Sequence, residues 1–476
     1  MTSSDLILLS AREAVGLLRR GDVSPRELVD AAADRIASVD PAVNAVPTLC
    51  LDMAREAAEN MIPPEVPGPG WLGGLPILVK DLSDVAGVRT TYGSPIFADH
   101  VPDRDDLMVA RLKRNGAIVM GKTNTPEFGA GANTFNEVFG KTRNPWNTDM
   151  TCGGSSGGAA VALATGMTWL ATGSDLGGSL RTPASFCSVV GMRPTPGRVA
   201  TGPGSDPFQT LSVNGPMGRN VADMALMLDA EAGVNPYYPL SLPTPETSFE
   251  SAALSPFLPK RIGFSPDLGI GPVDKEVAEI CRAAAEKLAG AGATVEESCP
   301  DFTGAMDVFQ TLRAALFVTG RATLLENHRD KLKPEMIWNI EKGMKLTAGE
   351  IGRAQNERAR LSERVAQWFE SHDVLACPVA IVPPFDVDIR YVESVGDHAF
   401  DNYVDWLYIV AAITLTGCPA ISVPCGFTST GLPVGLQLVA PPRSEAALLS
   451  MAASAEEIFG LSGQLPIDPR LGSAWA

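Results

Sequence analysis

Two glycine-rich turns, each carrying a serine, constrain this chain more than any other feature of its sequence. Ser155 lies in the segment 153–158, which reads GGSSGG, and Ser179 follows 24 residues later within the segment 173–181. Glycine permits positive φ angles and lets the backbone approach other groups closely. Such a turn can be a flexible loop, an anion-binding nest or a strained catalytic turn. The glycines alone therefore fix two tight turns without saying what the turns do.

The second turn carries the more informative pattern. In Gly177–Ser179, successive backbone N–H groups can point at one spot, which is how an oxyanion hole is built beside a nucleophile. Asp175 and Arg181 flank this turn. We interpret these two residues as an internal ion pair that shapes the turn, rather than as catalytic groups.

A serine hydroxyl needs an adjacent base to act as a nucleophile near neutral pH. None of the four histidines lies in a glycine-rich turn. A lysine can take the place of histidine if burial keeps it neutral. Lys80 follows the apolar run 75–79, which predicts a short buried strand and places this lysine well for desolvation. Its position alone also fits a surface lysine at a strand end that pairs with Asp81.

Several segments spread along the chain resemble the amidase signature family, whose members are Ser-cisSer-Lys amidohydrolases. The resemblance covers nearly the whole chain, and its combination of motifs is specific. The segments that carry it are the N-terminal helices, the Lys80 segment, the two serine turns and residues 121–128, 143–147, 214–217 and 431–437.

This resemblance implies a role for each residue of the two turns. Ser179 is the nucleophile, and an acyl-enzyme formed on it is resolved by water or another nucleophile. Ser155 follows a cis peptide bond from Gly154 and relays protons to Lys80, which is the ultimate base. The implied oxyanion donors are the backbone amides of Leu176, Gly177, Gly178 and Ser179. The implied supporting residues are Gly154, Ser156, Asp175 and Arg181.

Three positions depart from the common forms of the family pattern. Leu176 stands where threonine or isoleucine is frequent, Leu180 where isoleucine is, and Cys152 where proline or alanine is usual. None of these changes removes a chemical group that the implied mechanism uses. Leu176 alters a wall near the oxyanion site, so we expect it to affect the choice of substrate.

The fold implied by the resemblance is α/β, a large mixed and twisted β-sheet covered by helices on both faces. We expect a single domain over residues 1–476, with a core signature at about 70–220 and a variable, mostly helical substrate-pocket region at about 300–400. Recurring helix-then-strand patterns agree with α/β layering. Residues 235–260, rich in Pro, Ser and Thr, are the best candidate for a linker or surface excursion.

Local signals place helices before and after the first turn. Ser10 with Glu13 and Ser24 with Glu27 fit capping boxes, the second followed by a proline at the first helical position. The apolar run 159–164 predicts a buried helix whose N-terminus carries the Ser155 turn. Five apolar residues of the later helical region are more typical of core than of substrate contacts: Met306, Phe309, Leu312, Leu316 and Phe317.

Composition narrows the class of partner. A net charge of −17 and the lack of basic runs disfavour nucleic acid and anionic membranes. The eight cysteines form no C-x-x-C and no zinc-like spacing, so we expect free thiols in a reducing cytoplasm and no metal. The N-terminus lacks the features of a secretory signal, and no apolar run is long enough for a transmembrane helix. No organic cofactor is implied, and homodimers are common in the family.

These observations predict an amidohydrolase that cleaves a C–N bond of small to medium uncharged amides, aliphatic or aryl. Anilides, esters and carbamates (urethanes) present the same kind of carbonyl with a leaving group and can share the chemistry. One alternative is the glutaminase component of a tRNA-dependent amidotransferase, which shares the fold and triad. That component typically has a serine-leucine-aspartate-glutamine run where this chain has the segment 210–216, so a stand-alone hydrolase is favoured.

A second alternative comes from the segment 153–157, which also satisfies G-x-S-x-G, the nucleophile elbow of α/β-hydrolases. That fold requires a later histidine, for which His372 and His398 are the candidates. Neither has a supporting motif, and this interpretation leaves Lys80 and the Ser179 turn unexplained.

Overall fold

The computed structural model describes residues 2–204 and 206–472. Its strands are β1 Thr48–Leu49, β2 Pro76–Lys80, β3 Ile118–Thr123, β4 Phe135–Asn136, β5 Gly140–Lys141, β6 Arg143–Asn144, β7 Asn147–Thr151, β8 Leu170–Asp175, β9 Val190–Arg193, β10 Val213–Gly218, β11 Arg261–Phe264, β12 Thr294–Glu297, β13 Val374–Pro378, β14 Ser394–Val395, β15 His398–Ala399, β16 Ala420–Phe427 and β17 Pro433–Val439.

The helices are α1 Ser3–Leu8, α2 Ala11–Arg20, α3 Pro25–Val43, α4 Leu51–Glu59, α5 Leu107–Arg114, α6 Gly157–Ala164, α7 Arg181–Cys187, α8 Val221–Glu231, α9 Phe249–Ala253, α10 Lys275–Gly290, α11 Ala305–His328, α12 Pro334–Met344, α13 Ala348–Phe369, α14 Tyr408–Thr416 and α15 Glu445–Phe459. Short 3₁₀ turns lie at Pro95–Phe97, Glu127–Gly129, Arg329–Lys331, Asp405–Leu407 and Ser462–Gln464.

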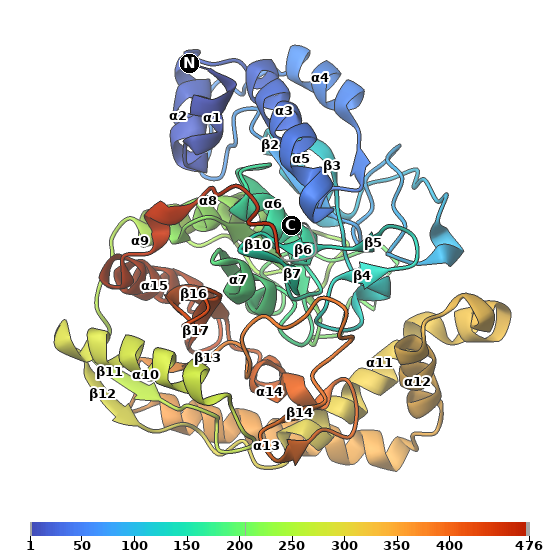
Figure 1. Ribbon diagram of the computed structural model, residues 1–476, viewed down its shortest axis with the longest axis vertical. Coiled ribbons are helices and arrows are strands. Elements are labelled where there is room, and N and C mark those ends of the chain that lie inside the picture. Colours follow the sequence, from blue (N-terminus) through green and yellow to red (C-terminus); the bar gives the residue numbers. More distant parts are fainter. Residues whose placement is uncertain (1, 205, 473–476) are drawn as a thin grey trace.

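One eleven-stranded sheet runs through the centre of the molecule, with the order β1-β3-β2-β8-β10-β9-β16-β17-β13-β11-β12 (Figure 1). Its direction is mixed. β2 is parallel to both β3 and β8, and β11 is parallel to both β12 and β13. The strands between these two groups pair antiparallel. The expected α/β class with a large mixed sheet flanked by helices is therefore confirmed.

The predicted start signals form real caps. The side chain of Ser10 accepts from the N–H of Glu13, whose carboxylate accepts from the N–H of Ser10, and Ser24 and Glu27 repeat the arrangement. These reciprocal bonds satisfy donors that a helix start leaves free. The helix after the first serine turn, α6, is buried along its whole length and packs on β2 and β8.

The parallel pairing of β2 with β8 positions the two candidate segments. The two strands are neighbours in the sheet, with Leu78 opposite Ala171. Since parallel strands end at the same edge of a sheet, Lys80 at the end of β2 comes to lie beside Ser174 and Asp175 at the end of β8. The turn that carries Ser179 follows directly and leads into α7.

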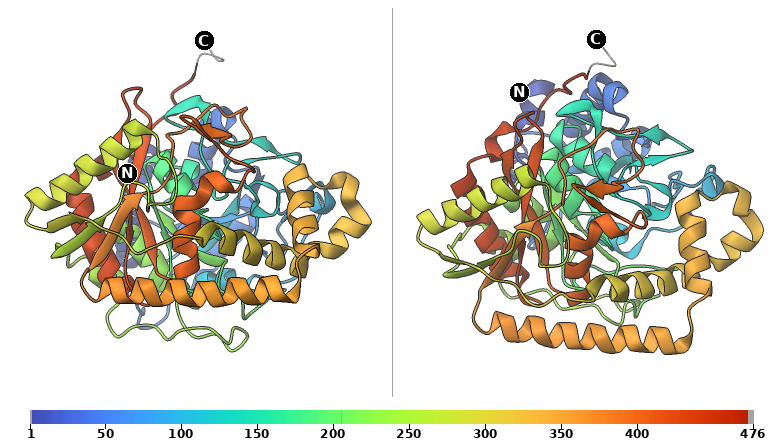
Figure 2. Two further views of the ribbon diagram at one scale, coloured as in Figure 1. Left: turned by 90° about the horizontal axis from the view of Figure 1, so that it is seen from below. Right: turned by 60° about the horizontal axis from the view of Figure 1, so that its bottom comes forward.

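The later helices form a separate layer. α11 and α12 make a hairpin that projects to one side, and α13 runs along the outside of the molecule beneath them (Figures 1 and 2). The segment 235–260, expected to be a linker or surface excursion, contains the helix α9. Its first residue, Phe249, is buried, because α9 packs on α8 and α15.

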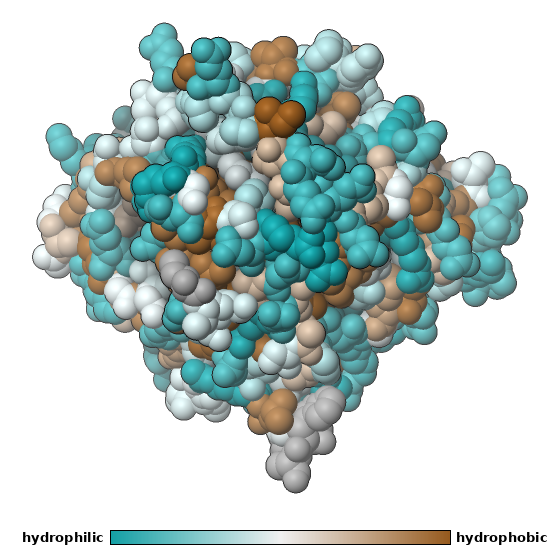
Figure 3. Space-filling view, turned by 90° about the horizontal axis from the view of Figure 1, so that it is seen from above, coloured by the Kyte–Doolittle hydropathy of each residue, from teal (hydrophilic) through white to brown (hydrophobic). Residues whose placement is uncertain are grey.

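Hydrophilic residues cover most of the face in Figure 3, with apolar residues in small groups between them. Among residues 2–204 and 206–472, no helix is both long enough and apolar enough to span a membrane.

Candidate active site

Lys80 is fully buried, and its amine faces hydroxyl groups rather than carboxylates. Its Nζ donates to Ser155 Oγ at 2.7 Å, to Ser156 Oγ at 2.8 Å and to Ser174 Oγ at 3.0 Å. Asp81, the partner that the surface alternative gave it, instead lies 3.6 Å from Lys122 on the next strand. The interpretation of Lys80 as an exposed lysine paired with Asp81 is therefore wrong.

Burial lowers the pKa of Lys80 to about 7, although the negative charge of Asp175 opposes this change. A lysine with this pKa is substantially neutral at neutral pH. Its lone pair can then accept the proton of a hydroxyl, which an ordinary ammonium group cannot do. The structure thus supplies the desolvation that the sequence predicted for this residue.

The first serine turn brings its hydroxyl to Lys80 and its backbone to the second turn. The Gly154–Ser155 peptide bond is cis, as the family resemblance implied. The N–H of Ser156 donates to the carbonyl oxygen of Ser179 at 3.1 Å. Gly129 closes the other side, since a Cβ there would lie 3.3 Å from Ser155 Oγ. The two serine turns therefore meet in one small volume.

Ser179 is the most accessible of the three predicted catalytic residues, 9% exposed against 2% for Ser155 and 0% for Lys80. A nucleophile must meet substrate, whereas a relay and a base need not. The tight turn before it requires glycine: Gly178 has φ +93°, and a Cβ there would lie 2.5 Å from Val410 Cγ2.

The predicted oxyanion donors divide into two groups. The N–H of Gly178 donates to Asp175 Oδ1 at 3.0 Å and is therefore occupied in this structure. Within the described chain, the N–H groups of Leu176, Gly177 and Ser179 make no hydrogen bond. These three groups are the donors that the turn leaves available.

Asp175 holds the nucleophile turn in shape. It accepts two hydrogen bonds from Arg181, at 3.0 and 2.9 Å, and one from the N–H of Leu180. Arg193 donates to its carbonyl oxygen at 2.6 Å. Burial acts to raise the pKa of Asp175, but Arg181 and Arg193 together bring it below its ordinary value. The predicted ion pair is present, and Arg193 is a third member that sequence reasoning missed.

Arg181 also ties the turn to distant parts of the chain. Its guanidinium donates to the carbonyl of Val410, to Thr414 Oγ1 in α14 and to Gln437 Oε1 in β17. Gln437 in turn donates to Cys377 Sγ at 3.1 Å. Gln437 lies in a segment that carried the family resemblance, but nothing in the sequence linked it to the nucleophile turn.

Apolar side chains wall the space beside the turn. Leu176 is partly buried and contacts two apolar clusters, one around α14 and one between α11 and α12. Phe309 lies 3.2 Å from the position that a Cβ of Gly177 would take. Of the five apolar residues in the helical region, Phe309, Leu312 and Phe317 are buried, as expected for core, while Met306 and Leu316 are partly buried.

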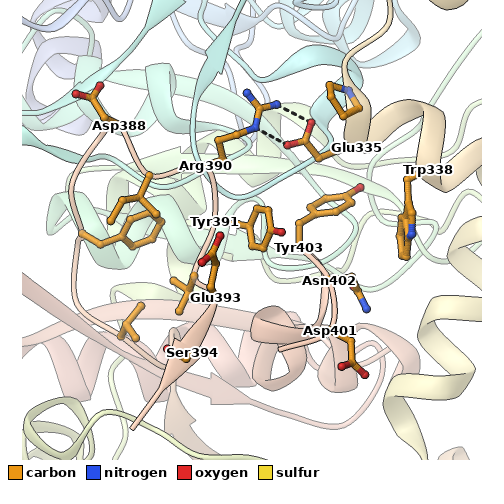
Figure 4. Close-up of a pocket in the computed structure, with 15 residues that line it drawn as sticks. Glu335, Trp338, Asp388, Arg390, Tyr391, Glu393, Ser394, Asp401, Asn402 and Tyr403 are labelled. Atoms are coloured by element: carbon orange, nitrogen blue, oxygen red, sulfur yellow. Dashed lines mark hydrogen bonds and ion pairs between the residues drawn. The ribbon is translucent and has the colours of Figure 1, made fainter. Parts of the chain in front are cut away.

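A groove of about 940 Å³ lies between α12 and the loops that follow β13 (Figure 4). Arg390 spans one end of it and donates to both carboxylate oxygens of Glu335, at 2.9 and 2.8 Å. Asn133 connects the groove to the first serine turn, because its side chain donates to the carbonyl of Ile389 while its backbone packs on Gly154. Sequence reasoning placed variability in this region but named none of these groove residues.

The histidines proposed for a nucleophile elbow lie elsewhere. His372 stacks on Trp368 with its Nε2 2.6 Å from Glu296, and His398 is exposed in β15. Neither contacts Ser155, so the elbow interpretation has no support. In the chain as described, no three His, Cys, Asp or Glu side chains gather so that they could hold a metal ion.

Comparison with known proteins agrees with this geometry. A family model described as Amidase matches residues 27–449. The chain is 35% identical to the acylamidase of Rhodococcus erythropolis over 98% of this chain and 99% of that protein. It is 36% identical to the A component of the glutamyl-tRNA(Gln) amidotransferase of Moorella thermoacetica, over 95% of this chain and 97% of that protein.

The solved structures give the same answer. The crystal structure of a bacterial aryl acylamidase of the amidase signature enzymes family has a TM-score of 0.87 to this chain at 26% identity, covering 97% of this chain and 100% of that one. With the fold, the family model and the relatives in agreement, the chain belongs to the amidase family, the amidase signature enzymes, and is a hydrolase that acts on amides.

Proposed function

We propose that this enzyme hydrolyses amides through an acyl-enzyme on Ser179, with Ser155 as the proton relay and Lys80 as the base. The observation that carries the proposal is the buried amine of Lys80, which lies 2.7 Å from Ser155 Oγ and has hydroxyl groups, rather than a carboxylate, as its side-chain partners. A base held in this way is neutral near pH 7 and can start the reaction.

In the first half of the reaction, Ser179 Oγ bonds to the substrate carbonyl carbon and gives its proton to Ser155, whose own proton passes to Lys80. The carbonyl oxygen takes the electron pair of the C=O π bond. The free N–H groups of Leu176, Gly177 and Ser179 are the proposed donors to this oxyanion. The C–N bond then breaks, and the proton returns through Ser155 to the leaving nitrogen.

In the second half, water takes the place of the amine. It loses a proton along the same relay and bonds to the acyl carbon. The bond from that carbon to Ser179 Oγ breaks, and the hydroxyl of Ser179 is restored with the returned proton. The products are a carboxylic acid and the free enzyme, so one set of three residues serves both halves.

The proposed substrates are small to medium amides, aliphatic or aryl, uncharged around the scissile bond. The apolar walls at Leu176 and Phe309 suit an alkyl or aryl group beside the carbonyl. The relatives named acylamidase and aryl acylamidase support the same class. Anilides, esters and carbamates (urethanes) are included, because each presents a carbonyl with a leaving group to the same nucleophile.

The experiment that tests this proposal is intact-mass analysis after exposure to a fluorophosphonate. The wild type should gain a single adduct that peptide mapping places on Ser179. Ser179→Ala should gain none, and Ser155→Ala should gain the same adduct more slowly. An adduct that persists in Ser179→Ala would move the nucleophile elsewhere and overturn the proposal. A panel of chromogenic anilides, esters and carbamates on the wild type then ranks the substrates.

A second candidate function is that of the glutaminase component of an amidotransferase, which the 36% identity to the Moorella thermoacetica protein favours. Such a component releases ammonia from glutamine for a partner. The two functions separate cleanly. A stand-alone hydrolase cleaves anilides without a partner, whereas a glutaminase component releases ammonia from glutamine and co-purifies with the rest of its complex.

We also propose that residues 1–476 act as a single domain, with the catalytic core at about 70–220 and the substrate-selecting part at about 300–400. The eight cysteines, all free thiols, support a reducing, cytoplasmic setting. Limited proteolysis tests the domain proposal, since one domain should resist cutting between these two parts.

A further inference from the structure

Arg321, in the second half of α11, is a cation without an anion. Its guanidinium lies over two aromatic rings, 5.3 Å from the ring centre of Phe128 and 4.9 Å from that of Phe317. Its Nε is buried without a hydrogen-bond acceptor, and no carboxylate of residues 2–204 or 206–472 pairs with it. A desolvated charge in this state is costly unless something else satisfies it.

Other buried arginines of this protein are neutralised by acids. Arg181 and Arg193 share Asp175, and Arg198 pairs with Glu445 at 3.0 Å. The chain carries a net charge of −17, so carboxylates are abundant, yet none reaches Arg321. The missing partner is therefore a local feature of α11 and does not come from a general shortage of acids.

The surroundings of Arg321 reinforce its positive character. Arg313, two turns earlier on α11, has Tyr403 and Asn339 as its partners instead of a carboxylate. Burial, together with the like charge of Arg313, lowers the pKa of Arg321 to about 10, so the guanidinium stays protonated at neutral pH. The α11 helix thus presents two cations and lacks the acids that would balance them.

The position of Arg321 relates it to the reaction centre. Phe128, which lies under its guanidinium, precedes Gly129, and a Cβ on Gly129 would lie 3.3 Å from Ser155 Oγ. Phe317, the second ring, belongs to the same apolar cluster that Leu176 of the oxyanion turn contacts. The wall that starts at the reacting serines therefore ends at Arg321, a few residues away.

We propose that Arg321 binds a carboxylate on the substrate, at the end of the molecule remote from the scissile amide. A guanidinium offers a planar fork of N–H donors that matches a carboxylate, and stacking on two rings fixes its orientation in advance. This inference rests on the proposed function and narrows it: the amide is uncharged around the reacting carbonyl, but carries an anionic group at its far end.

The test uses paired 4-nitroanilides that differ in one charge. The first arm compares ω-carboxyacyl 4-nitroanilides, from succinyl to suberoyl, with uncharged alkanoyl 4-nitroanilides of matching length. The second arm places the charge on the leaving group and compares acetanilides with a para-carboxylate or a para-carboxamide. The two arms show whether the carboxylate belongs to the acyl or the amine part.

We expect the wild type to favour the charged member of at least one pair. Arg321→Gln should lower the charged-to-uncharged ratio of kcat/KM about tenfold or more, as expected when a hydrogen bond to a charged group is lost. Arg321→Lys should keep part of the preference. The matched control is Arg329→Gln at the end of the same helix, where Arg329 is 56% exposed and paired with Glu341; its ratio should equal that of the wild type.

Equal ratios in the wild type and Arg321→Gln, or a wild type without a charge preference in either arm, would overturn the inference while Ser179 labelling leaves the proposed function standing. Failure of Ser179 labelling would instead overturn the proposed function. In that case the shift in melting temperature with glutarate to suberate still tests Arg321. A shift in the wild type that is lost in Arg321→Gln supports the inference, and equal shifts or none overturn it.

Discussion

Two lysines on neighbouring strands are both fully buried, yet the protein uses them differently. Lys80 ends β2 and donates to the hydroxyls of Ser155, Ser156 and Ser174. Lys122 lies in β3, donates to the carbonyl of Ser83 and to Thr90 Oγ1, and has Asp81 3.6 Å away. The strands are paired parallel, so the two amines occupy similar depths of the same sheet.

The difference between them is the sign of what surrounds each amine. Burial lowers the pKa of both lysines. For Lys122 the close carboxylate of Asp81 opposes the change and makes the ammonium form a partner in an ion pair. For Lys80 the nearest carboxylate belongs to Asp175, which two arginines already hold. Burial alone therefore does not make a lysine a base; burial without an available anion does.

The largest effect that would sharpen this comparison is on catalysis. Lys80→Met should lower kcat by roughly a thousandfold, within the range that general-base catalysis contributes. Lys122→Met should leave the folded enzyme within about tenfold of the wild type, since its amine touches no reacting group. Single-turnover release of 4-nitroaniline measures both, with circular dichroism to confirm folding. Similar losses in the two variants would break the comparison.

The second effect is on stability, and its order is reversed. Lys122→Met leaves Asp81 buried and unpaired, so it should cost about 3–5 kcal/mol of the free energy of unfolding. The double variant Lys122→Met with Asp81→Asn should recover part of that loss. Lys80→Met removes an amine that has no acid partner and should cost little or stabilise. Denaturant titration of the three variants decides, and a Lys80→Met protein as unstable as Lys122→Met contradicts the comparison.

The third effect is on pH dependence. Lys80 acts only when neutral, and its pKa is about 7. Below that pH it becomes protonated, so kcat/KM should fall about tenfold per pH unit, and above it the rate should level off. Asp81→Asn serves as the control, because Asp81 pairs with Lys122 and its loss should leave the midpoint in place. A midpoint that moves with Asp81, or a flat profile down to pH 5, would rule out Lys80 as the base.

The smallest effect concerns single hydroxyls. Ser174→Ala removes one of the three acceptors of Lys80 and should lower kcat by roughly three- to tenfold, the worth of one hydrogen bond. It should also move the midpoint of the pH profile to lower pH, because that hydroxyl stabilises the ammonium form. Thr90→Val makes the matching change beside Lys122 and should leave both quantities unchanged. Steady-state kinetics across pH measures the pair.

The sequence predicted most of what forms the reaction centre, because its residues belong to two tight turns and one strand end. The motifs around Lys80, Ser155 and Ser179 are local in the chain, and so are the caps at Ser10 and Ser24. The parallel pairing of β2 with β8 then does what no local pattern can: it brings segments almost 100 residues apart to one edge of the sheet.

What the sequence did not predict depends on contacts between distant segments. Ser174 appeared as a flanking residue of the second turn, and its contact with Lys80 follows only from the pairing of the strands. Arg193 and Arg321 resemble any other arginine until their neighbours are known. The engagement of the Gly178 N–H by Asp175 is a matter of turn geometry that a glycine run leaves open. Charge and hydrogen-bond partners, more than residue types, were the missing information.

The bond from Arg181 to Gln437 has a consequence for the order in which the enzyme is made. The two residues are 256 positions apart, so the nucleophile turn is synthesised long before the strand that completes its surroundings. Proteins emerge from the ribosome N-terminus first. Until β17 has emerged, the guanidinium beside the turn lacks one of its acceptors. We therefore expect a growing chain that already contains Lys80, Ser155 and Ser179 to stay inactive until almost all of it has been synthesised.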